Sequence, residues 1–136
     1  MVTYTEKDIK VSASGDLTIA SNGDLELAAA SGVLKQDVAF RVKTDYDDFT
    51  PHPDIGADLS SLIGEVNSRA TALVGEQKII RSLTKDGRIG AKDLVVQSMP
   101  INLSSVVYYT FLRDGVSVLN VTPDMSFDMN KGIISY

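Results

Sequence analysis

The chain has 136 residues, of which 43% are hydrophobic and 23% are charged, and its 18 acidic and 13 basic side chains give a net charge of −5. This length suits a single domain, and the composition is that of a globular rather than a disordered protein. With no cysteine and one histidine, the chain can form no disulfide, thiolate zinc site, cysteine nucleophile or metal site with two imidazoles. We therefore expect one globular domain without a metal or other cofactor.

Charge is segregated along the chain. Residues 44–68 carry six acidic side chains and no basic one, whereas residues 69–92 carry six basic and two acidic ones. Complementary blocks predict surfaces that contact each other, either within one molecule or between neighbours. A negative net charge and a basic block without aromatic residues argue against nucleic acid as a partner.

The sequence also argues against a membrane location. No apolar run approaches the length of about 20 residues that a membrane-spanning helix requires. The first residues, Met-Val-Thr-Tyr-Thr-Glu, lack the charged and then apolar pattern of a secretory signal. We expect a protein that is made and kept in a cytoplasm-like compartment.

The first thirty residues predict a β-ribbon. Residues 14–19, Ser-Gly-Asp-Leu-Thr-Ile, recur as residues 22–27, Asn-Gly-Asp-Leu-Glu-Leu. Each copy places a Gly-Asp turn before alternating apolar and polar residues, which is typical of a hairpin. Two copies are too few for a repeat fold.

Helical periodicity begins after Gly32. Apolar residues spaced by four predict a helix over residues 33–42, and the aspartates and prolines of residues 44–53 predict a loop. Asp58 is placed to cap a short helix over residues 59–63, with Gly64 as its stop.

A longer helix is predicted over residues 68–85, with a break possible at Gly75 because glycine costs about 1 kcal/mol relative to alanine there. Its apolar side is expected to contain Ala70, Leu73, Ile80 and Leu83. Four basic residues fall within an arc of about 80° on the opposite side; they are Lys78, Arg81, Lys85 and Arg88.

From residue 93 the apolar period changes from that of a helix to that of a strand. Strands are predicted at residues 94–96, 106–112, 116–121, 125–129 and 133–134, with an interruption at Pro100 and turns at residues 114–115 and 130–132. The expected fold class is α+β: an N-terminal β-ribbon (1–30), a helical core (31–90) and C-terminal antiparallel β-hairpins in a small mixed sheet (91–136), forming one domain over residues 1–136.

The catalytic and ligand-binding motifs that individual residues suggest are incomplete in this sequence. Glu65 precedes the long helix and Glu76 lies within it, but no aspartate follows either at the spacing of phage-type lysozymes, and Glu76 is better interpreted as a solvated charge on the helix face. The aspartates of residues 45–48 lack the glycine and glutamate positions of a calcium loop. His52 lies between two prolines with no nucleophile at motif spacing. Gly87 and Gly90 lack the lysine and hydroxyl pair of a phosphate-binding loop. We do not expect an enzyme.

Several segments in order resemble a known family. They are the early Ser-Gly-Asp-Leu, then Gly-Val-Leu-Lys-Gln-Asp-Val (32–38), Arg-Val-Lys-Thr (41–44), Pro-Asp-Ile-Gly-Ala-Asp-Leu (53–59) and Leu-Ile-Gly (62–64). Over residues 14–95 the chain is similar to the small wedge proteins of contractile-tail baseplates. These are the sheath initiators, once named acidic lysozymes, and a type VI secretion baseplate component is similar.

The resemblance implies a structural protein of the virion tail baseplate, assembled in the host cytoplasm and present in several copies around a six-fold baseplate. Its implied partners are other wedge proteins and tail sheath subunits, with the tail tube as a further candidate. The family carries a Glu-Pro-Arg contact signature after the long helix, and the matching residues here are Asp86-Gly87-Arg88. The C-terminal strands are implied to interlock with sheath strands.

The candidate interaction residues follow from the basic stripe and from the strands. On the long helix and its end they are Lys78, Arg81, Lys85, Asp86, Gly87 and Arg88, with Arg88 as the anchor. On the strands they are Val107, Tyr109, Phe111, Val116 and Val118. The uncharged run of residues 106–112 would be prone to aggregate as a free edge, so either a neighbour or the chain's own termini must cover it.

Two other functions remain open. One is a peptidoglycan-degrading muramidase associated with the tail, as the family's older name states. The other is a β-rich hub or spike fragment, suggested by the paired Gly-Asp-Leu turns, although the helical middle argues against it.

Overall fold

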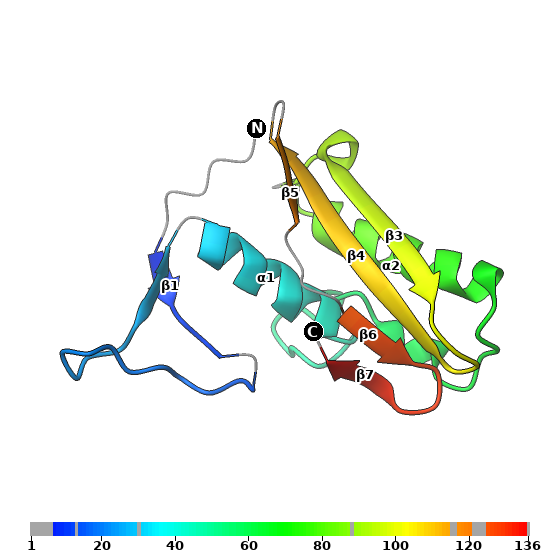
Figure 1. Ribbon diagram of the computed structural model, residues 1–136, viewed down its shortest axis with the longest axis horizontal. Helices are drawn as coiled ribbons and strands as arrows, with labels where there is room; N and C mark the ends of the chain where they lie inside the picture. Colours follow the sequence, from blue (N-terminus) through cyan, green and yellow to red (C-terminus); the bar gives the residue numbers. More distant parts are fainter. Residues whose placement is uncertain are drawn as a thin grey trace.

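The computed structural model describes residues 7–12, 14–29, 31–87, 89–114, 117–120 and 125–135. A C-terminal antiparallel sheet lies in front of a helical layer, and an N-terminal ribbon projects away from both (Figure 1). The elements are β1 (Lys7–Ile9), β2 (Leu27–Ala29), α1 (Ser31–Lys43), the 3-10 helix η1 (Leu59–Leu62), α2 (Arg69–Thr84), the 3-10 helix η2 (Ala91–Asp93), β3 (Leu94–Pro100), β4 (Ser105–Asp114), β5 (Ser117–Asn120), β6 (Met125–Asp128) and β7 (Gly132–Ser135). The expected α+β class is confirmed.

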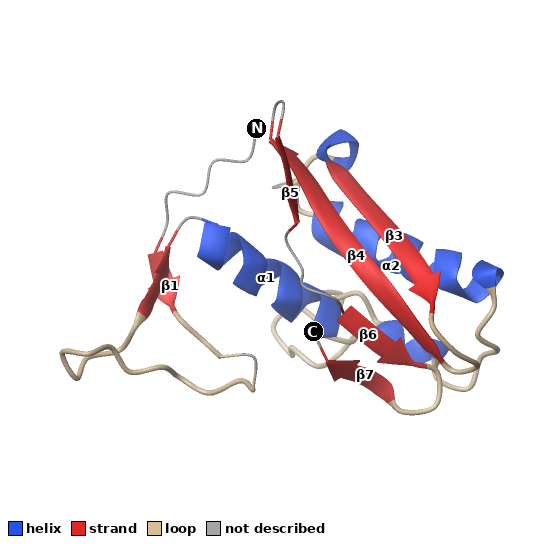
Figure 2. Ribbon diagram, viewed as in Figure 1, coloured by secondary structure: helices blue, strands red, loops and turns tan. Residues whose placement is uncertain are grey.

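Strand β4 is the centre of the larger sheet (Figure 2). One of its edges pairs with β3 over residues 106–112. The other edge pairs with β6 over residues 105–108 and with β5 over residues 111–114. Strand β7 continues the sheet beyond β6. We expected a small mixed sheet, and all the pairings that the structure describes are antiparallel.

The hairpins that the sequence predicts in the sheet are present. Asp114, which the sequence places in the first turn, is instead the last residue of β4 and pairs with Ser117, and residues 115–116 lie outside the described residues. Asp128 pairs with Gly132 across the predicted turn at residues 130–132. Strand β3 extends beyond the predicted residues 94–96 and ends at Pro100, where the sequence predicts an interruption. Proline is tolerated at this place because its missing N–H faces away from β4.

The repeated Gly-Asp-Leu segments form two hairpins with the same hydrogen bonds. In the first, the Ser12 N–H donates to the Asp16 carbonyl and the Gly15 N–H donates to the Ser12 carbonyl. In the second, Ala20 takes the place of Ser12, with Asp24 and Gly23 in the other two positions. Gly15 and Gly23 have φ angles of 92° and 85°, which side chains other than glycine rarely adopt. Local turn chemistry therefore builds the ribbon.

The hydrophobic core lies between the helices and one face of the sheet. Helix α1 contributes Leu34, Val38 and Val42, which confirms the spacing seen in the sequence. The sheet contributes Tyr108 and Phe127, both fully buried. Burial of such side chains provides about 1.5–3 kcal/mol each. Alternate residues of β4 therefore face the helices, and those between them face the opposite side of the sheet.

Helix α2 starts as predicted, because the Ser68 Oγ accepts a hydrogen bond from the Thr71 N–H. It runs unbroken through Gly75. Its buried face is partly the expected one: Leu83 is fully buried and Ile80 is partly buried against the core, whereas Leu73 is 42% exposed and Ala70 is exposed. The residues that face the core are Ala72, Gly75, Ile79, Ser82 and Leu83. The close approach of Tyr108 to Gly75 sets this rotation, and a periodicity argument could not include it.

The expected cap by Asp58 is also wrong. Asp58 occupies the cap position of η1, but its φ of 55° turns the carboxylate away from the helix and it makes no capping hydrogen bond. Instead, the Asp45 carboxylate accepts a hydrogen bond from the Ser60 N–H at 3.2 Å. The side chain of Asp58 is therefore available to α2.

Candidate protein-interaction site

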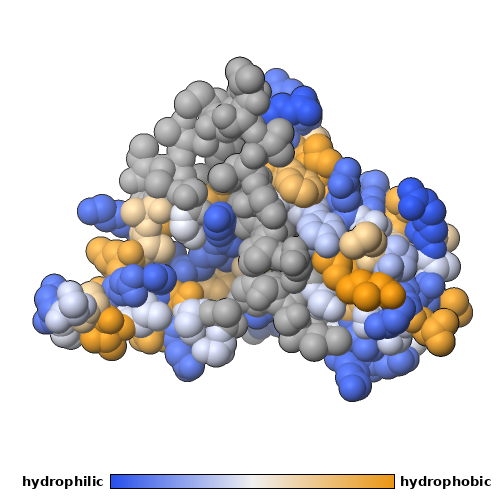
Figure 3. Space-filling model, in the orientation of Figure 1, coloured by the Kyte–Doolittle hydropathy of each residue, from blue (hydrophilic) through white to orange (hydrophobic). Residues whose placement is uncertain are grey.

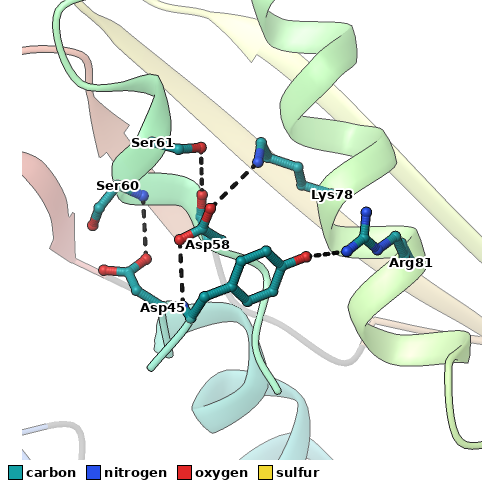
Figure 4. Close-up of polar contacts among 7 residues, drawn as sticks. Asp45, Asp58, Ser60, Ser61, Lys78 and Arg81 are labelled. Atoms are coloured by element: carbon teal, nitrogen blue, oxygen red, sulfur yellow. Dashed lines mark hydrogen bonds and ion pairs between the residues drawn. The ribbon is translucent and has the colours of Figure 1, made fainter. Parts of the chain in front are cut away.

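The acidic segment and the basic stripe contact each other within the same chain. Lys78 pairs with Asp58 at 3.6 Å, and Lys85 donates to the Asp54 carboxylate. Figure 4 shows Lys78 and Arg81 on α2 pointing toward the loop that carries Asp45 and Asp58. Of the two arrangements that the charge pattern allowed, the contact within one molecule is present.

Tyr46 joins this loop to α2 at a second place. Its hydroxyl oxygen accepts a hydrogen bond from Arg81, whose guanidinium carbon also lies 5.6 Å from the centre of the tyrosine ring. The Tyr46 N–H donates to the Asp58 carboxylate at 3.3 Å. The loop is thus tied down by hydrogen bonds, an ion pair and a cation–π contact.

The basic stripe is only partly available to a partner. The side chains of Lys78 and Asp58 are 26% and 21% exposed, whereas those of Lys85 and Asp54 are 44% and 68% exposed. The hydrogen bond from Lys85 holds the pKa of Asp54 below its ordinary value. Lys78, Arg81 and Lys85 therefore hold the acidic loop of the same chain in place.

The end of α2 carries the segment that matches the family signature. The Asp86 carboxylate accepts a hydrogen bond from Arg41 of α1 at 2.5 Å, and the Gly87 N–H donates to the Thr84 carbonyl. Asp86-Gly87 thus forms the turn at the helix end and links it to α1. Arg88, the expected anchor, lies outside the described residues.

The candidate residues of β4 lie on the sheet face opposite the helices. Val107 is buried, Tyr109 and Phe111 are partly buried, and the two aromatic rings stack with centroids 6.5 Å apart. On the same face, their partners in β3 include Val95 and Met99, which are 40% and 52% exposed. Figure 3 views this side, where hydrophobic side chains lie among polar ones over β3 and β4.

Strand β4 itself offers no free edge over its paired residues, because β3 covers one side and β5 and β6 cover the other. The chain's own C-terminal strands therefore provide part of the expected covering. Within the described part of the chain, the outer strands are β3, β5 and β7. Val118 belongs to β5, where it pairs with Arg113, and its side chain lies outside the described residues, as does Val116 altogether.

Sequence reasoning missed the role of Glu76. Its carboxylate accepts hydrogen bonds from the Ser98 N–H at 2.7 Å and the Ser98 hydroxyl at 2.6 Å. The interpretation as a solvated helix-face charge is therefore wrong. Burial, aided by the negative charge of Glu76, raises the pKa of Tyr108, so this phenol stays protonated and donates to the Ala72 carbonyl. No local pattern pairs Glu76 with a residue on a distant strand.

The projecting ribbon carries an apolar face. Ile9 lies opposite Leu27 and Ile19 lies opposite Leu25, and direct partners share a face. Leu25 and Leu27 share a face through strand alternation. These side chains are 38–64% exposed. The Gln36 amide of α1 holds the ribbon's base, donating to the Ile9 carbonyl and accepting from the Val11 N–H.

Comparison of the chain with protein-family models, with curated proteins and with solved structures found no significant match. Among the described residues, no helix combines the length and hydropathy needed to cross a membrane.

Proposed function

We propose that this chain is a non-enzymatic structural protein of a contractile-tail baseplate. In this role it binds neighbouring wedge proteins and provides strand edges on which the first sheath subunits assemble. The proposal rests on the ordered sequence resemblance over residues 14–95, to which the fold adds surfaces suited to such contacts.

The arrangement of the C-terminal sheet is the main structural support. Strands β5 and β7 are outer strands in the described part of the sheet, and β4 anchors the sheet to the core through Tyr108. An added strand gains main-chain hydrogen bonds from such an edge, while alternate side chains fix its register. The central strand β4 is fixed to the core, and the two groups of strands that pair with its second edge, β5 and β6–β7, each end in an outer strand. This arrangement suits a protein on which other strands assemble.

The ribbon and the tied loop add to this support. The exposed apolar face of the ribbon, defined by Ile9, Ile19, Leu25 and Leu27, is the kind of surface that a neighbouring protein covers. The ion pairs between α2 and residues 54–58 hold a second exposed surface in one conformation. A wedge component must present several fixed surfaces at once.

Reconstitution tests the proposed function directly. Baseplates that lack this protein would be mixed with purified sheath subunits, with and without the purified chain, and extended sheaths would be counted by electron microscopy. We expect sheaths to begin only when the chain is present. Equal numbers of sheaths in both mixtures would contradict the proposal.

The muramidase alternative has a separate test. The purified chain should leave the turbidity of a peptidoglycan suspension unchanged over the time in which a lysozyme control clears it. Clearing that depends on Glu65 or Glu76 would overturn the non-enzymatic assignment.

A further inference from the structure

A carboxylate from helix α2 binds the outer edge of β3. The Ser98 N–H donates to the Glu76 carboxylate, so it points away from β4. β3 and β4 pair without a shift in register, and outward groups recur at every second residue of an antiparallel strand. The backbone groups of Leu94 and Val96 therefore face outward as well. Pro100, at the next outward position, has no N–H to offer.

This strand lacks the side chains that normally protect an edge. Residues 94–100, Leu-Val-Val-Gln-Ser-Met-Pro, include no charged residue. Val95 and Met99 are 40% and 52% exposed. Uncharged apolar edge strands recruit other strands, and proteins usually prevent this with a charge or a proline on the strand itself. In this chain Pro100 protects the C-terminal end of β3, and the charge that protects the rest of the edge is that of Glu76 in helix α2.

We propose that the outer edge of β3 is a latent pairing surface for β3 of a second copy of this chain, and that Glu76 keeps it closed. An antiparallel pair centred on Val96 would place the outward groups of residues 94, 96 and 98 opposite those of residues 98, 96 and 94. Such a contact is self-complementary, as a two-fold interface must be, and it brings no like charges of the two strands together.

Glu76 blocks this contact in two ways. Its carboxylate already occupies the Ser98 N–H that the incoming strand needs. The incoming carbonyl oxygen would also meet a negative oxygen, and closing the interface would bury that charge without a cation. Strand addition is thereby restricted to other edges of the sheet. This inference concerns the isolated chain and does not depend on a role in a baseplate.

Sedimentation of purified variants tests the inference. Glu76→Ala should form a dimer of about twice the monomer mass as its concentration rises, whereas the unaltered chain stays monomeric. Glu65→Ala is the matched control, because it removes the same charge from an exposed loop residue, and it should stay monomeric. The double variant Glu76→Ala/Ser98→Pro should return to the monomer, because proline removes the exposed N–H without affecting the bonds to β4.

Two results would overturn the inference. A folded Glu76→Ala variant that stays monomeric would show that the edge needs no carboxylate to remain closed. A dimer that persists in the double variant would place the contact elsewhere. If circular dichroism shows that Glu76→Ala does not fold, Glu76→Met provides the same test, because its side chain keeps a similar volume but carries no charge and cannot accept a hydrogen bond from the Ser98 N–H as the carboxylate does. It should dimerise as the alanine variant would, and a folded, strictly monomeric Glu76→Met would also contradict the proposal.

Discussion

Gly75 of α2 lies directly against the ring of Tyr108 in β4. A β-carbon on Gly75 would fall 2.5 Å from Cζ of Tyr108, and the hydroxyl oxygen would be closer still. The Tyr108 hydroxyl continues past this point to donate to the Ala72 carbonyl at 3.4 Å. The absence of a side chain at residue 75 thus lets the central strand pack tightly on the helix.

Substitution of Gly75 by alanine should destabilise the protein, although alanine is the better helix former. Overpacking of a core typically costs about 1–3 kcal/mol, and the helix-propensity gain of about 1 kcal/mol offsets only part of it. Urea unfolding would measure the loss. The control is Gly32→Ala in α1, where the nearest atom, Cβ of Ala28, is 3.8 Å away. It should leave stability unchanged or slightly raised, and an equal loss in both variants would contradict the packing argument.

The Lys78–Asp58 pair should contribute a measurable coupling to stability. In a double-mutant cycle with Lys78→Met and Asp58→Asn, we expect a coupling of about 1 kcal/mol or less, decreasing as salt is added. The more exposed Lys85–Asp54 pair serves as the comparison and should couple more weakly. Calorimetry of the four proteins in each cycle would test this, and the opposite ranking would show that exposure does not govern these pairs.

Asp128 should make the protein less stable in acid. The Asn130 N–H donates to its carboxylate at 2.7 Å. This hydrogen bond lowers the pKa of Asp128 below its ordinary value. A carboxylate with a lowered folded-state pKa stabilises the fold above its unfolded pKa of about 3.9, and this stabilisation is lost as the pH falls through the folded-state value.

Asp128→Asn removes this titration. Its stability should therefore fall less steeply than that of the unaltered protein as the pH is lowered below about 4. Thermal melts across this range would provide the comparison. Parallel curves for the two proteins would mean that Asp128 does not contribute to the acid sensitivity.

Gln36 should control how firmly the ribbon is held. Its amide both donates to the Ile9 carbonyl and accepts from the Val11 N–H. Gln36→Ala should speed amide exchange at Val11, whereas Gln36→Glu should restore that protection in part because a carboxylate can still accept. Lys35→Ala, at an exposed neighbouring position, is the control. Unchanged exchange in Gln36→Ala would mean that other contacts hold the ribbon.

The features that could be predicted from the sequence are those set by nearby residues. The two Gly-Asp turns, the start of α2 at Ser68 and the hairpins after Asp114 and Asp128 depend on residues a few positions apart. The strands followed from alternation, and the contact between the acidic and basic blocks was one of two arrangements that their charges allowed.

The remaining features depend on residues far apart in the chain. Glu76 and Ser98 are separated by 22 residues, and Gly75 meets Tyr108 only after the sheet has packed on α2. The rotation of the buried face of α2 and the turning of Asp58 toward Lys78 follow from such tertiary contacts. Helical periodicity and cap statistics describe one segment at a time, so neither could reveal them.

The central claim is that neighbouring strands add to the outer strands of this sheet when the baseplate carries sheath. Hydrogen exchange of the free chain and of sheathed baseplates, compared amide by amide, measures this most directly. The proposed function predicts that alternate amides of β5 or β7 exchange fast in the free chain and slowly in the assembly, while those of β4, which is already paired on both sides, change little. Equal protection of β5 and β7 in the two states would contradict the claim.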